Sequence, residues 1–249
     1  MNIWAIVPAA GIGRRMAPIL PEQDARQVPN TVARQVPKQY REVAGQPVLA
    51  HSLLKLLALP ELEQVVVVLH PDDEHFARLA IARNAKVIST TGGKERQDSV
   101  LNGLAALSEA QADDWVLVHD AVRPCVTVAD LQKLLTTLAD HPVGGLLGAP
   151  VDSTLKAVDD NSVVTGTVDR SRLWQAYTPQ MFRVGQLRKA MQQASDSKKA
   201  ITDEASAIEA YGLQPQLVLG NKHNIKITHE SDLQLADWLL QEQLRAGSS

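Results

Sequence analysis

The sequence predicts an α/β fold in which helices cover both faces of a mostly parallel sheet. Short apolar runs alternate with longer amphipathic stretches along most of the 249 residues, the pattern of strands joined by crossover helices. Two of the runs, 65–69 and 115–118, are apolar at every position, as expected for strands buried on both faces. Ligands of such a fold bind at the carboxyl ends of its strands.

The expected elements alternate in a regular order. Strands are predicted at 3–8, 64–69, 85–89, 115–119 and 144–150, and later at 216–219 and 224–227. Helices are predicted at 48–59, 73–83, 97–107 and 128–139, and later at 184–194, 202–211 and 231–244. Pro47 suits the first turn of one helix and Thr127 the N-cap of another. Together these elements predict a three-layer α/β sandwich.

Beyond Pro150 the alternation is interrupted. β-type runs at 154–158 and 163–168 flank the turn residues 159–162, which predicts a β-hairpin. A lone hairpin is marginal in water, so we expect residues 151–172 to form an arm that packs on a second copy of the chain in a homodimer. The alternative is a hairpin folded onto its own domain.

Composition narrows the class of protein. The hydrophobic content of 45% supports a full core, and the net charge of −3 does not favour nucleic acid as a partner. No apolar stretch is long enough to cross a bilayer, and the start of the chain lacks the features of a signal peptide, so no membrane partner is expected. Cys125 is the only cysteine. A cytoplasmic, reducing location is therefore favoured, and a small buried side chain is expected there rather than a reactive thiol.

The most informative stretch is PAAGIGRRM at 8–16, directly after the first predicted strand. Its small residues let backbone N–H groups approach an anion; they are Pro8, Ala9, Ala10, Gly11 and Gly13. Arg15 then offers a forked positive charge for phosphate oxygens. The stretch predicts a nucleotide phosphate site, with a plain tight turn as the alternative. It is not a dinucleotide fingerprint, because Met16 takes the third glycine position.

A polar segment follows this stretch and contains a short duplication. The sequence ARQVP occurs at 25–29 and again at 33–37. Prolines without a hydrophobic period predict an irregular, flexible insertion over 17–36. Because it adjoins the predicted phosphate site, we expect it to act as a lid.

Further polar residues follow the insertion and the third strand. Lys38, in the sequence PKQY, can join Arg15 on one triphosphate. Gly93 belongs to a glycine pair that leads into a helix, where a phosphate or a base edge can rest on backbone groups. Ser99, one turn into that helix, can bond a pyrimidine edge or the helix backbone.

The sequence HDAVRP closes the fourth predicted strand. Asp120 is placed there for a ribose hydroxyl or Mg²⁺, and Arg123 either pairs with Asp120 or meets a substrate phosphate. His119 is expected to be a packed, hydrogen-bonded histidine. The seven histidines show no zinc-like spacing, so no transition-metal site is predicted, and any protein ligands of a metal stay undefined.

Taken in order, the motifs PAAGxGRRM, PKQY, GGxxRxxSV, HDAxRP, TVDR, TPQ, ITDEAS and NIK resemble those of one family. This family is the 2-C-methyl-D-erythritol 4-phosphate cytidylyltransferases of the non-mevalonate isoprenoid route. The resemblance implies one Rossmann-like domain over residues 1–249, with a projecting β-hairpin arm at 151–172 and arm-exchanging homodimers. It implies transfer of CMP from CTP to methylerythritol phosphate, with Mg²⁺ carried mainly by the CTP phosphates.

The resemblance also implies roles for matching residues. Arg15 and Lys38 resemble the cations that stabilise the transition state, with Arg170 and Lys226 holding the sugar phosphate. The nucleotide would be bound by Pro8, Ala9, Ala10, Gly11, Gly13, Gly93, Ser99, Asp120 and Ala121. The sugar phosphate would be bound by Arg123, Thr154, Arg170, Thr178, Thr202 and Lys226. Of these, Thr154 and Arg170 are expected to reach the pocket of the partner subunit.

Three other functions were weighed. The closest is a cytidylyltransferase acting on a pentitol phosphate such as ribitol 5-phosphate, which would differ at the arm and the alcohol pocket. A non-catalytic nucleotide-binding protein is disfavoured because Arg15 and Lys38 are both present. A nicotinamide-dependent dehydrogenase is disfavoured by the failed dinucleotide fingerprint.

Overall fold

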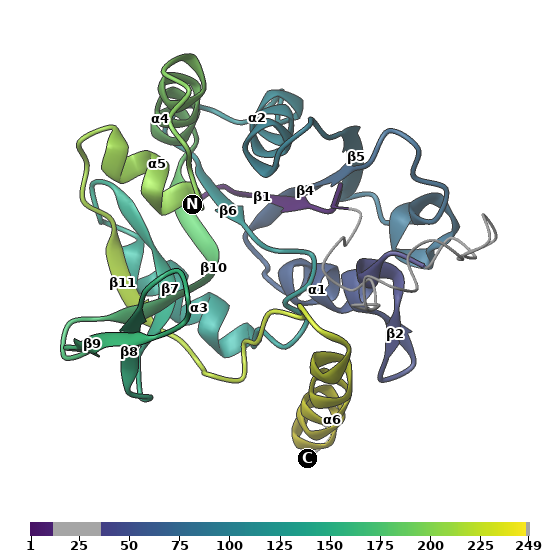
Figure 1. Ribbon diagram of the computed structural model, residues 1–249. Coiled ribbons are helices and arrows are strands. Elements are labelled where there is room, and N and C mark those ends of the chain that lie inside the picture. The colour runs from purple at the N-terminus through teal and green to yellow at the C-terminus, as the bar shows by residue number, and fades with distance from the viewer. Residues whose placement is uncertain (12–35, 248–249) are drawn as a thin grey trace, which may run out of the picture.

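A seven-stranded sheet forms the centre of the computed structural model, which describes residues 1–11 and 36–247 (Figure 1). Its strand order is β11-β7-β10-β6-β1-β4-β5. Neighbouring strands are parallel except where β10 pairs with β6 and with β7. The predicted mostly parallel α/β sheet is therefore confirmed.

Most strands lie where the sequence predicts them. The bounds are β1 Ile3–Pro8, β4 Leu62–Leu69, β5 Val87–Thr91, β6 Trp115–Val118, β7 Gly144–Pro150, β10 Trp174–Arg183 and β11 Gln216–Leu219. The sequence analysis missed β10, because a proline inside a run argues against a central strand. Pro179 does interrupt the ladder, since the register with β7 breaks between Ala176 and Gln180.

Helices cover both faces of the sheet (Figure 1). One face carries α1 (Val48–Leu57) and α3 (Val128–Leu138), and the other carries α2 (Arg96–Ala106), α4 (Val184–Asp196) and α5 (Glu204–Ala210). Alternate residues of β1 serve the two layers, since Ala5 packs in one core cluster and Ile6 in the other. The apolar character of every position in the central strands follows from this double burial.

The C-terminal helix α6 (Glu230–Gly247) packs on a small hairpin of β2 (Glu42–Val43) and β3 (Gln46–Pro47). Cys125 is fully buried in the cluster beneath it, as the sequence predicts. Among residues 1–11 and 36–247, no helix combines the length and apolar character needed to cross a membrane.

Two predicted elements are wrong. The helix predicted at 73–83 is replaced by two short 3-10 helices, Phe76–Arg78 and Ala80–Arg83, because Leu79 between them is extended. The strand predicted at 224–227 is instead a loop, fixed by hydrogen bonds to the segment after β6. The backbone N–H of Ile227 donates to Val122 (2.9 Å), and Arg123 donates to the carbonyl of Asn224 (2.7 Å).

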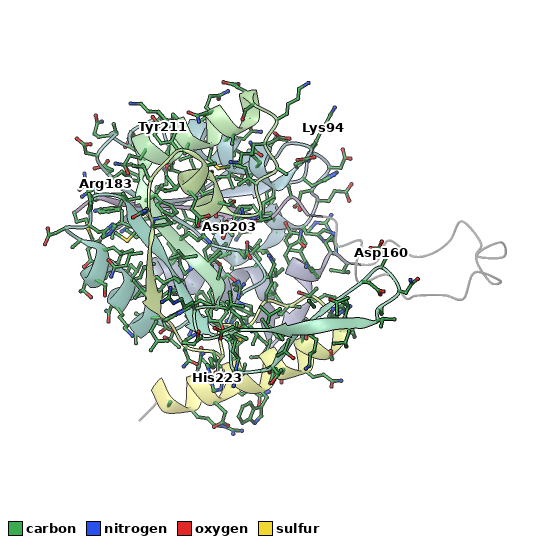
Figure 2. The ribbon with its side chains drawn as sticks, turned by 60° about the vertical axis from the view of Figure 1, so that its left-hand side comes forward. Lys94, Asp160, Arg183, Asp203, Tyr211 and His223 are labelled. Carbon is green, nitrogen blue, oxygen red and sulfur yellow. The ribbon has the colours of Figure 1, made fainter. Side chains whose placement is uncertain are left out.

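The predicted hairpin exists as a separate two-stranded sheet of β8 (Leu155–Val158) and β9 (Val164–Val168). The carboxylate of Asp159 accepts from the N–H groups of Asn161 and Val163, which closes the turn. Asp160 marks the tip of the arm, which projects from the body of the protein (Figure 2). Most of its side chains are exposed.

Candidate active site

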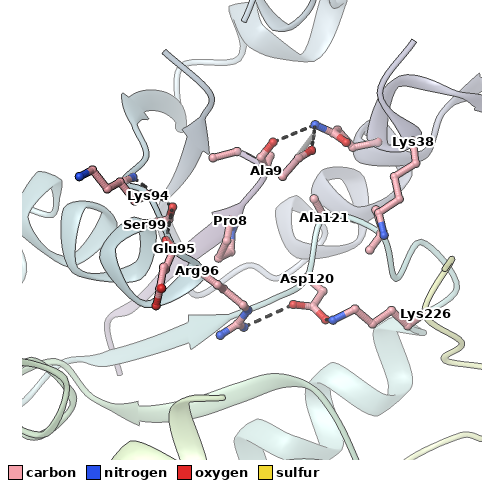
Figure 3. A pocket seen from close by; sticks show the side chains of 15 residues that line it. Pro8, Ala9, Lys38, Lys94, Glu95, Arg96, Ser99, Asp120, Ala121 and Lys226 are labelled. Atoms are coloured by element: carbon pink, nitrogen blue, oxygen red, sulfur yellow. Dashed lines mark hydrogen bonds and ion pairs between the residues drawn. The ribbon is translucent and has the colours of Figure 1, made fainter. Parts of the chain in front are cut away.

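A pocket opens at the carboxyl ends of β1 and β6, against the N-terminus of α2 (Figure 3). We call it the first pocket. It brings together the following residues that the sequence analysis selected: Pro8, Ala9, Ala10, Gly11, Lys38, Gly93, Ser99, Asp120, Ala121 and Lys226. These residues come from five separate stretches of the chain, and the parallel sheet explains why they meet at one edge.

The loop after β1 is held by Gln39, a residue that the sequence analysis did not select. Its side-chain amide is buried and donates to the carbonyls of Ala9 (2.9 Å) and Gly11 (3.2 Å). Gln39 sits in a short 3-10 helix, Lys38–Tyr40, whose Tyr40 hydroxyl donates to Asp73 (2.6 Å). Its place in the PKQY motif was the available signal.

The glycine pair before α2 is required by close packing. A Cβ on Gly92 would lie 2.6 Å from the Cβ of Ala10, and one on Gly93 would lie 2.1 Å from the Cβ of Asp98. Without side chains, the backbone can pass this close to the loop after β1 at Gly92 and to the first turn of α2 at Gly93. Ser99 accepts from the N–H of Gly93 (3.2 Å) and donates to the carbonyl of Glu95 (3.1 Å). The structure thus shows the helix-backbone alternative for Ser99.

Asp120 is a nearly buried carboxylate surrounded by three cations. Its oxygens lie 2.7 Å from the ammonium of Lys226, 3.3 Å from the guanidinium of Arg96 and 3.5 Å from that of Arg123. Burial favours the neutral acid, but Arg96, Lys226 and Arg123 outweigh it and hold the pKa of Asp120 well below its usual range. Asp120 is therefore a fixed negative charge at the floor of the pocket.

Arg123 takes the first of its two predicted roles, the pairing with Asp120, and it also braces the loop at 224–227. Its Nε lies 3.5 Å from Oδ2 of Asp120 in an ion pair, and its two terminal nitrogens donate to the carbonyls of Asn224 (2.7 Å) and Ala176 (3.4 Å). It lies 5.2 Å from the centre of the Tyr177 ring. These contacts fix the residue while one edge of it lines the cavity described next.

A second pocket adjoins the first. Five of its lining residues were selected from the sequence, namely Asp120, Arg123, Thr178, Thr202 and Lys226. Three residues line both pockets: Arg96, Asp120 and Lys226. Two ligands bound in the two pockets would therefore meet beside these three side chains.

His119 and Thr178 form a hydrogen-bonded chain under the two pockets. The hydroxyl of Thr178 accepts from the N–H of Asp120 (3.0 Å) and lies 3.0 Å from Nδ1 of His119. Nε2 of His119 lies 3.1 Å from the carbonyl of Arg123, an acceptor, so this bonding assigns the proton to Nε2. His119 is fully buried, and burial lowers its pKa to about 4. The prediction of a packed, hydrogen-bonded histidine is confirmed.

The remaining selected residues lie on the arm or outside the described part of the chain. Thr154 and Arg170 are exposed at the arm and line neither of the two cavities in a single chain. Gly13 and Arg15 lie outside the described residues, as does nearly all of the insertion at 17–36. Within the described part of the chain, no group of three or more His, Cys, Asp or Glu residues is arranged to hold a metal ion.

Besides Gln39, two further residues of the site were not selected from the sequence, although both lie in its motifs. Arg96, from GGxxRxxSV, borders both pockets, and Glu204, from ITDEAS, is fully buried against it with Oε1 at 2.5 Å from Nη1. In sequence each looks like a charged residue at the start of a helix, which is an ordinary surface position. Only the fold brings them together, because they are 108 residues apart.

An α/β sheet with adjoining cation-rich pockets at the carboxyl ends of its strands defines a phosphate-handling, nucleotide-binding class of protein. Comparison with known proteins narrows the class. Residues 3–242 match the family model of IspD, 2-C-methyl-D-erythritol 4-phosphate cytidylyltransferase.

Individual relatives agree with the family match. A protein of that name from Pseudomonas putida (strain GB-1) is 48% identical over 240 residues, covering 96% of this chain and 94% of the relative. Another from Aliivibrio fischeri (strain MJ11) is 44% identical over 242 residues, covering 97% and 95%. The crystal structure of the Francisella tularensis enzyme of the same name is similar, with a TM-score of 0.77 at 33% identity over 96% of this chain and 100% of that one.

The chain therefore belongs to the IspD family. The members are cytidylyltransferases, so it is a nucleotidyltransferase enzyme. The resemblance inferred from the motifs is confirmed, and so is the Rossmann-like α/β fold expected from it.

Proposed function

We propose that this chain transfers CMP from CTP to the phosphate of 2-C-methyl-D-erythritol 4-phosphate at the junction of the two pockets. The products are 4-diphosphocytidyl-2-C-methyl-D-erythritol and pyrophosphate, in non-mevalonate isoprenoid biosynthesis. Family membership supports the reaction. The observation that supports its location is the wall of Arg96, Asp120 and Lys226, which borders both cavities.

The nucleotide takes the first pocket in this proposal. Its triphosphate lies on the loop Pro8–Gly13 with Lys38 and Arg15, and its base lies at Gly93 and Ser99. In support, Lys38 and Lys226 stand on the same side of the first pocket (Figure 3). Asp120 and Ala121 lie beside the ribose and the metal-bound phosphates.

The sugar phosphate takes the second pocket, between Arg123, Thr178, Thr202 and Lys226. A phosphate oxygen attacks the α-phosphorus of CTP, and pyrophosphate leaves in line. The attacking group is already an anion, so no general base is needed and the protein contributes positioning and charge neutralisation. A pocket lined by Lys and Arg, with His119 buried beneath it, suits that chemistry.

Mg²⁺ fits this site as an ion carried by the nucleotide phosphates. Asp120 already has three cations at hand, which leaves it poorly suited to hold a metal without phosphate ligands. When bound, the ion would supply positive charge that offsets negative charge on the leaving pyrophosphate. Asp120, the carboxylate of this wall, would help to hold it together with the phosphates.

We further propose that the arm at 151–172 makes the enzyme a homodimer, with Thr154 and Arg170 completing the partner's second pocket. Its exposed apolar side chains support this, because Val163 and Val164 are 59% and 57% exposed. We also propose that residues 1–249 form one domain; in support, the seven-stranded sheet takes strands from 3–8 through 216–219. A cytoplasmic location is in keeping with the lone buried cysteine.

A pyrophosphate-release assay with CTP, Mg²⁺ and methylerythritol phosphate tests the function. Release that requires all three is the expected result. Ribitol 5-phosphate assayed in parallel separates the rival substrate, and we expect it to support little release. CTP binding without any release would contradict the proposed reaction.

A further inference from the structure

Arg96 occupies a decisive position that the sequence analysis did not assign. It is the first residue of α2 and lines both pockets. Figure 3 shows its guanidinium pointing toward Asp120. Of the three residues in that wall, it alone carries five N–H donors in one plane, so it can bond neighbouring carboxylates and still offer a donor to a phosphate oxygen. Its orientation should therefore matter to any transfer across the wall.

Glu204 fixes that orientation from behind. Its carboxylate is fully buried at the start of α5 and receives two bonds from the guanidinium, from Nη1 to Oε1 (2.5 Å) and from Nη2 to Oε2 (3.1 Å). Nη2 also reaches Oδ1 of Asp120 (3.3 Å). Because the planar guanidinium of Arg96 is bonded to carboxylates on two different parts of the fold, the orientation of its plane is fixed. Burial disfavours the charged guanidinium, but Glu204 and Asp120 outweigh it and raise the pKa of Arg96.

A purely structural role explains this arrangement poorly. The start of α5 is already secured without Glu204, because Asp203 and Ser206 form a capping box and the side chain of Gln180 accepts from the N–H of Ala205 (2.7 Å). A buried ion pair is also a weak source of stability compared with apolar packing. The cost of burying Glu204 is better explained by what it does to Arg96.

We propose that Glu204 is a positioning residue for cytidylyl transfer, holding the guanidinium of Arg96 in the wall where the two phosphates meet. Arg96 is the group that contacts phosphate, and Glu204 acts through it. Without Glu204, Arg96 would turn toward Asp120 and compete there with Lys226, which now lies 2.7 Å from that carboxylate. The inference rests on the proposed function, because it requires phosphates on both sides of Arg96.

The test compares Glu204→Gln, Arg96→Gln and the double variant in the pyrophosphate-release assay. Glu204→Gln keeps the size of the side chain and removes its charge. We expect kcat to fall by about 10- to 100-fold, the cost of a misplaced catalytic group. The KM for CTP should change by less than about threefold, because the loop after β1 is untouched. In the Arg96→Gln background, Glu204→Gln should add no further loss.

Ile208→Ala is the matched control for lost stability. Ile208 is fully buried on the same helix and contacts neither pocket, so this variant lowers the melting temperature while kcat stays near the wild-type value. If Glu204→Gln does not fold, Arg96→Lys replaces it. An ammonium cannot bond Glu204 and Asp120 in the same geometry, and kcat should again fall by about tenfold or more.

The outcomes are separable. A wild-type chain that releases no pyrophosphate overturns the proposed function and this inference together. An active wild type with a normal kcat in Glu204→Gln, or in Arg96→Lys where that variant replaces it, overturns the role of Glu204 alone. Losses that multiply in the double variant would show that Glu204 acts independently of Arg96, which also overturns the inference.

Discussion

The pocket wall and the arm are opposite kinds of structure on one chain. Around Asp120, which is nearly buried, charged groups pair with one another, and the residues come from the segment after β6, from α2 and from the loop at 224–227. Along β8 and β9 the side chains are exposed, and each strand pairs chiefly with the other. The site is built at the carboxyl ends of the central strands, whereas the arm is a separate two-stranded sheet without a core of its own.

The contrast indicates how the functional residues are divided. Arg96, Asp120 and Lys226 are placed by the fold of a single chain, whereas Thr154 and Arg170 are exposed on the arm. A preorganised wall lowers the cost of arranging charges at the moment of reaction. In the proposed homodimer, the arm would supply the remaining contacts after association. The predictions below test each side of this division.

The largest effect is expected at Lys38, which lines the first pocket. Lys38→Ala should lower kcat by about 10²- to 10³-fold, as for loss of a group that stabilises the transition state, and Arg15→Ala should act similarly. Stability should change by no more than about 1 kcal/mol, because Lys38 gives up a bond to the carbonyl of Ile227 (3.1 Å). Lys189→Ala, on the exposed side of α4, is the control. A turnover number near that of the control would refute the role of Lys38.

The buried, hydrogen-bonded side chain of His119 should make the stability of the folded protein sensitive to acid. Burial holds the pKa of His119 at about 4 in the folded state, below its ordinary value of 6.5. The resulting stability is fully present above about pH 6.5 and is lost as the pH falls toward 4. Between pH 7.5 and 4.5 we expect His119 to account for a loss of roughly 2–3 kcal/mol.

Urea unfolding of the wild type and of His119→Asn at both pH values measures this loss. The variant should be less stable at pH 7.5 and should lose less stability on acidification. His223→Gln, at an exposed site, should behave as the wild type does. An equal loss in wild type and His119→Asn would show that other groups carry the acid response.

How far the sequence predicts this molecule depends on the range of the interactions involved. Local patterns gave the parallel strands, the hairpin and the loop after β1, because periodicity and glycine placement act over a few residues. The strand β10 was missed because Pro179 reads locally as a break. The pairing of Arg96 with Glu204 was missed because it joins residues 108 apart. Motif order located the site, but only the fold shows which charges touch.

Arg170→Ala tests the arm. Loss of a charge-assisted contact of about 2 kcal/mol should raise the KM for methylerythritol phosphate by about 30-fold, with less effect on CTP. Mixing this variant with Lys38→Ala after dissociation and reassembly should restore activity. A mixed dimer pairs the intact pocket of one chain with the intact arm of the other, and about a quarter of wild-type activity is expected.

Two outcomes would contradict this prediction. Activity no higher than the sum of the separate variants would mean that Arg170 serves its own chain or no pocket at all. Wild-type chains taken through the same dissociation and reassembly provide the reference rate. A monomer in sedimentation experiments, with full activity, would contradict the proposed division between wall and arm.

The smallest effect is expected at Gln39, which holds the loop after β1. Gln39→Glu keeps the shape of the side chain but replaces the amide that donates to the carbonyls of Ala9 and Gly11 with a carboxylate that repels them. The loop after β1 should shift and weaken CTP binding by about tenfold, the effect of losing one to two kcal/mol. Calorimetric titration with CTP and Mg²⁺ measures this, with Gln132→Glu on the exposed face of α3 as the charge-matched control. Equal affinities for CTP in the two variants would show that the loop after β1 keeps its shape without the buried amide of Gln39.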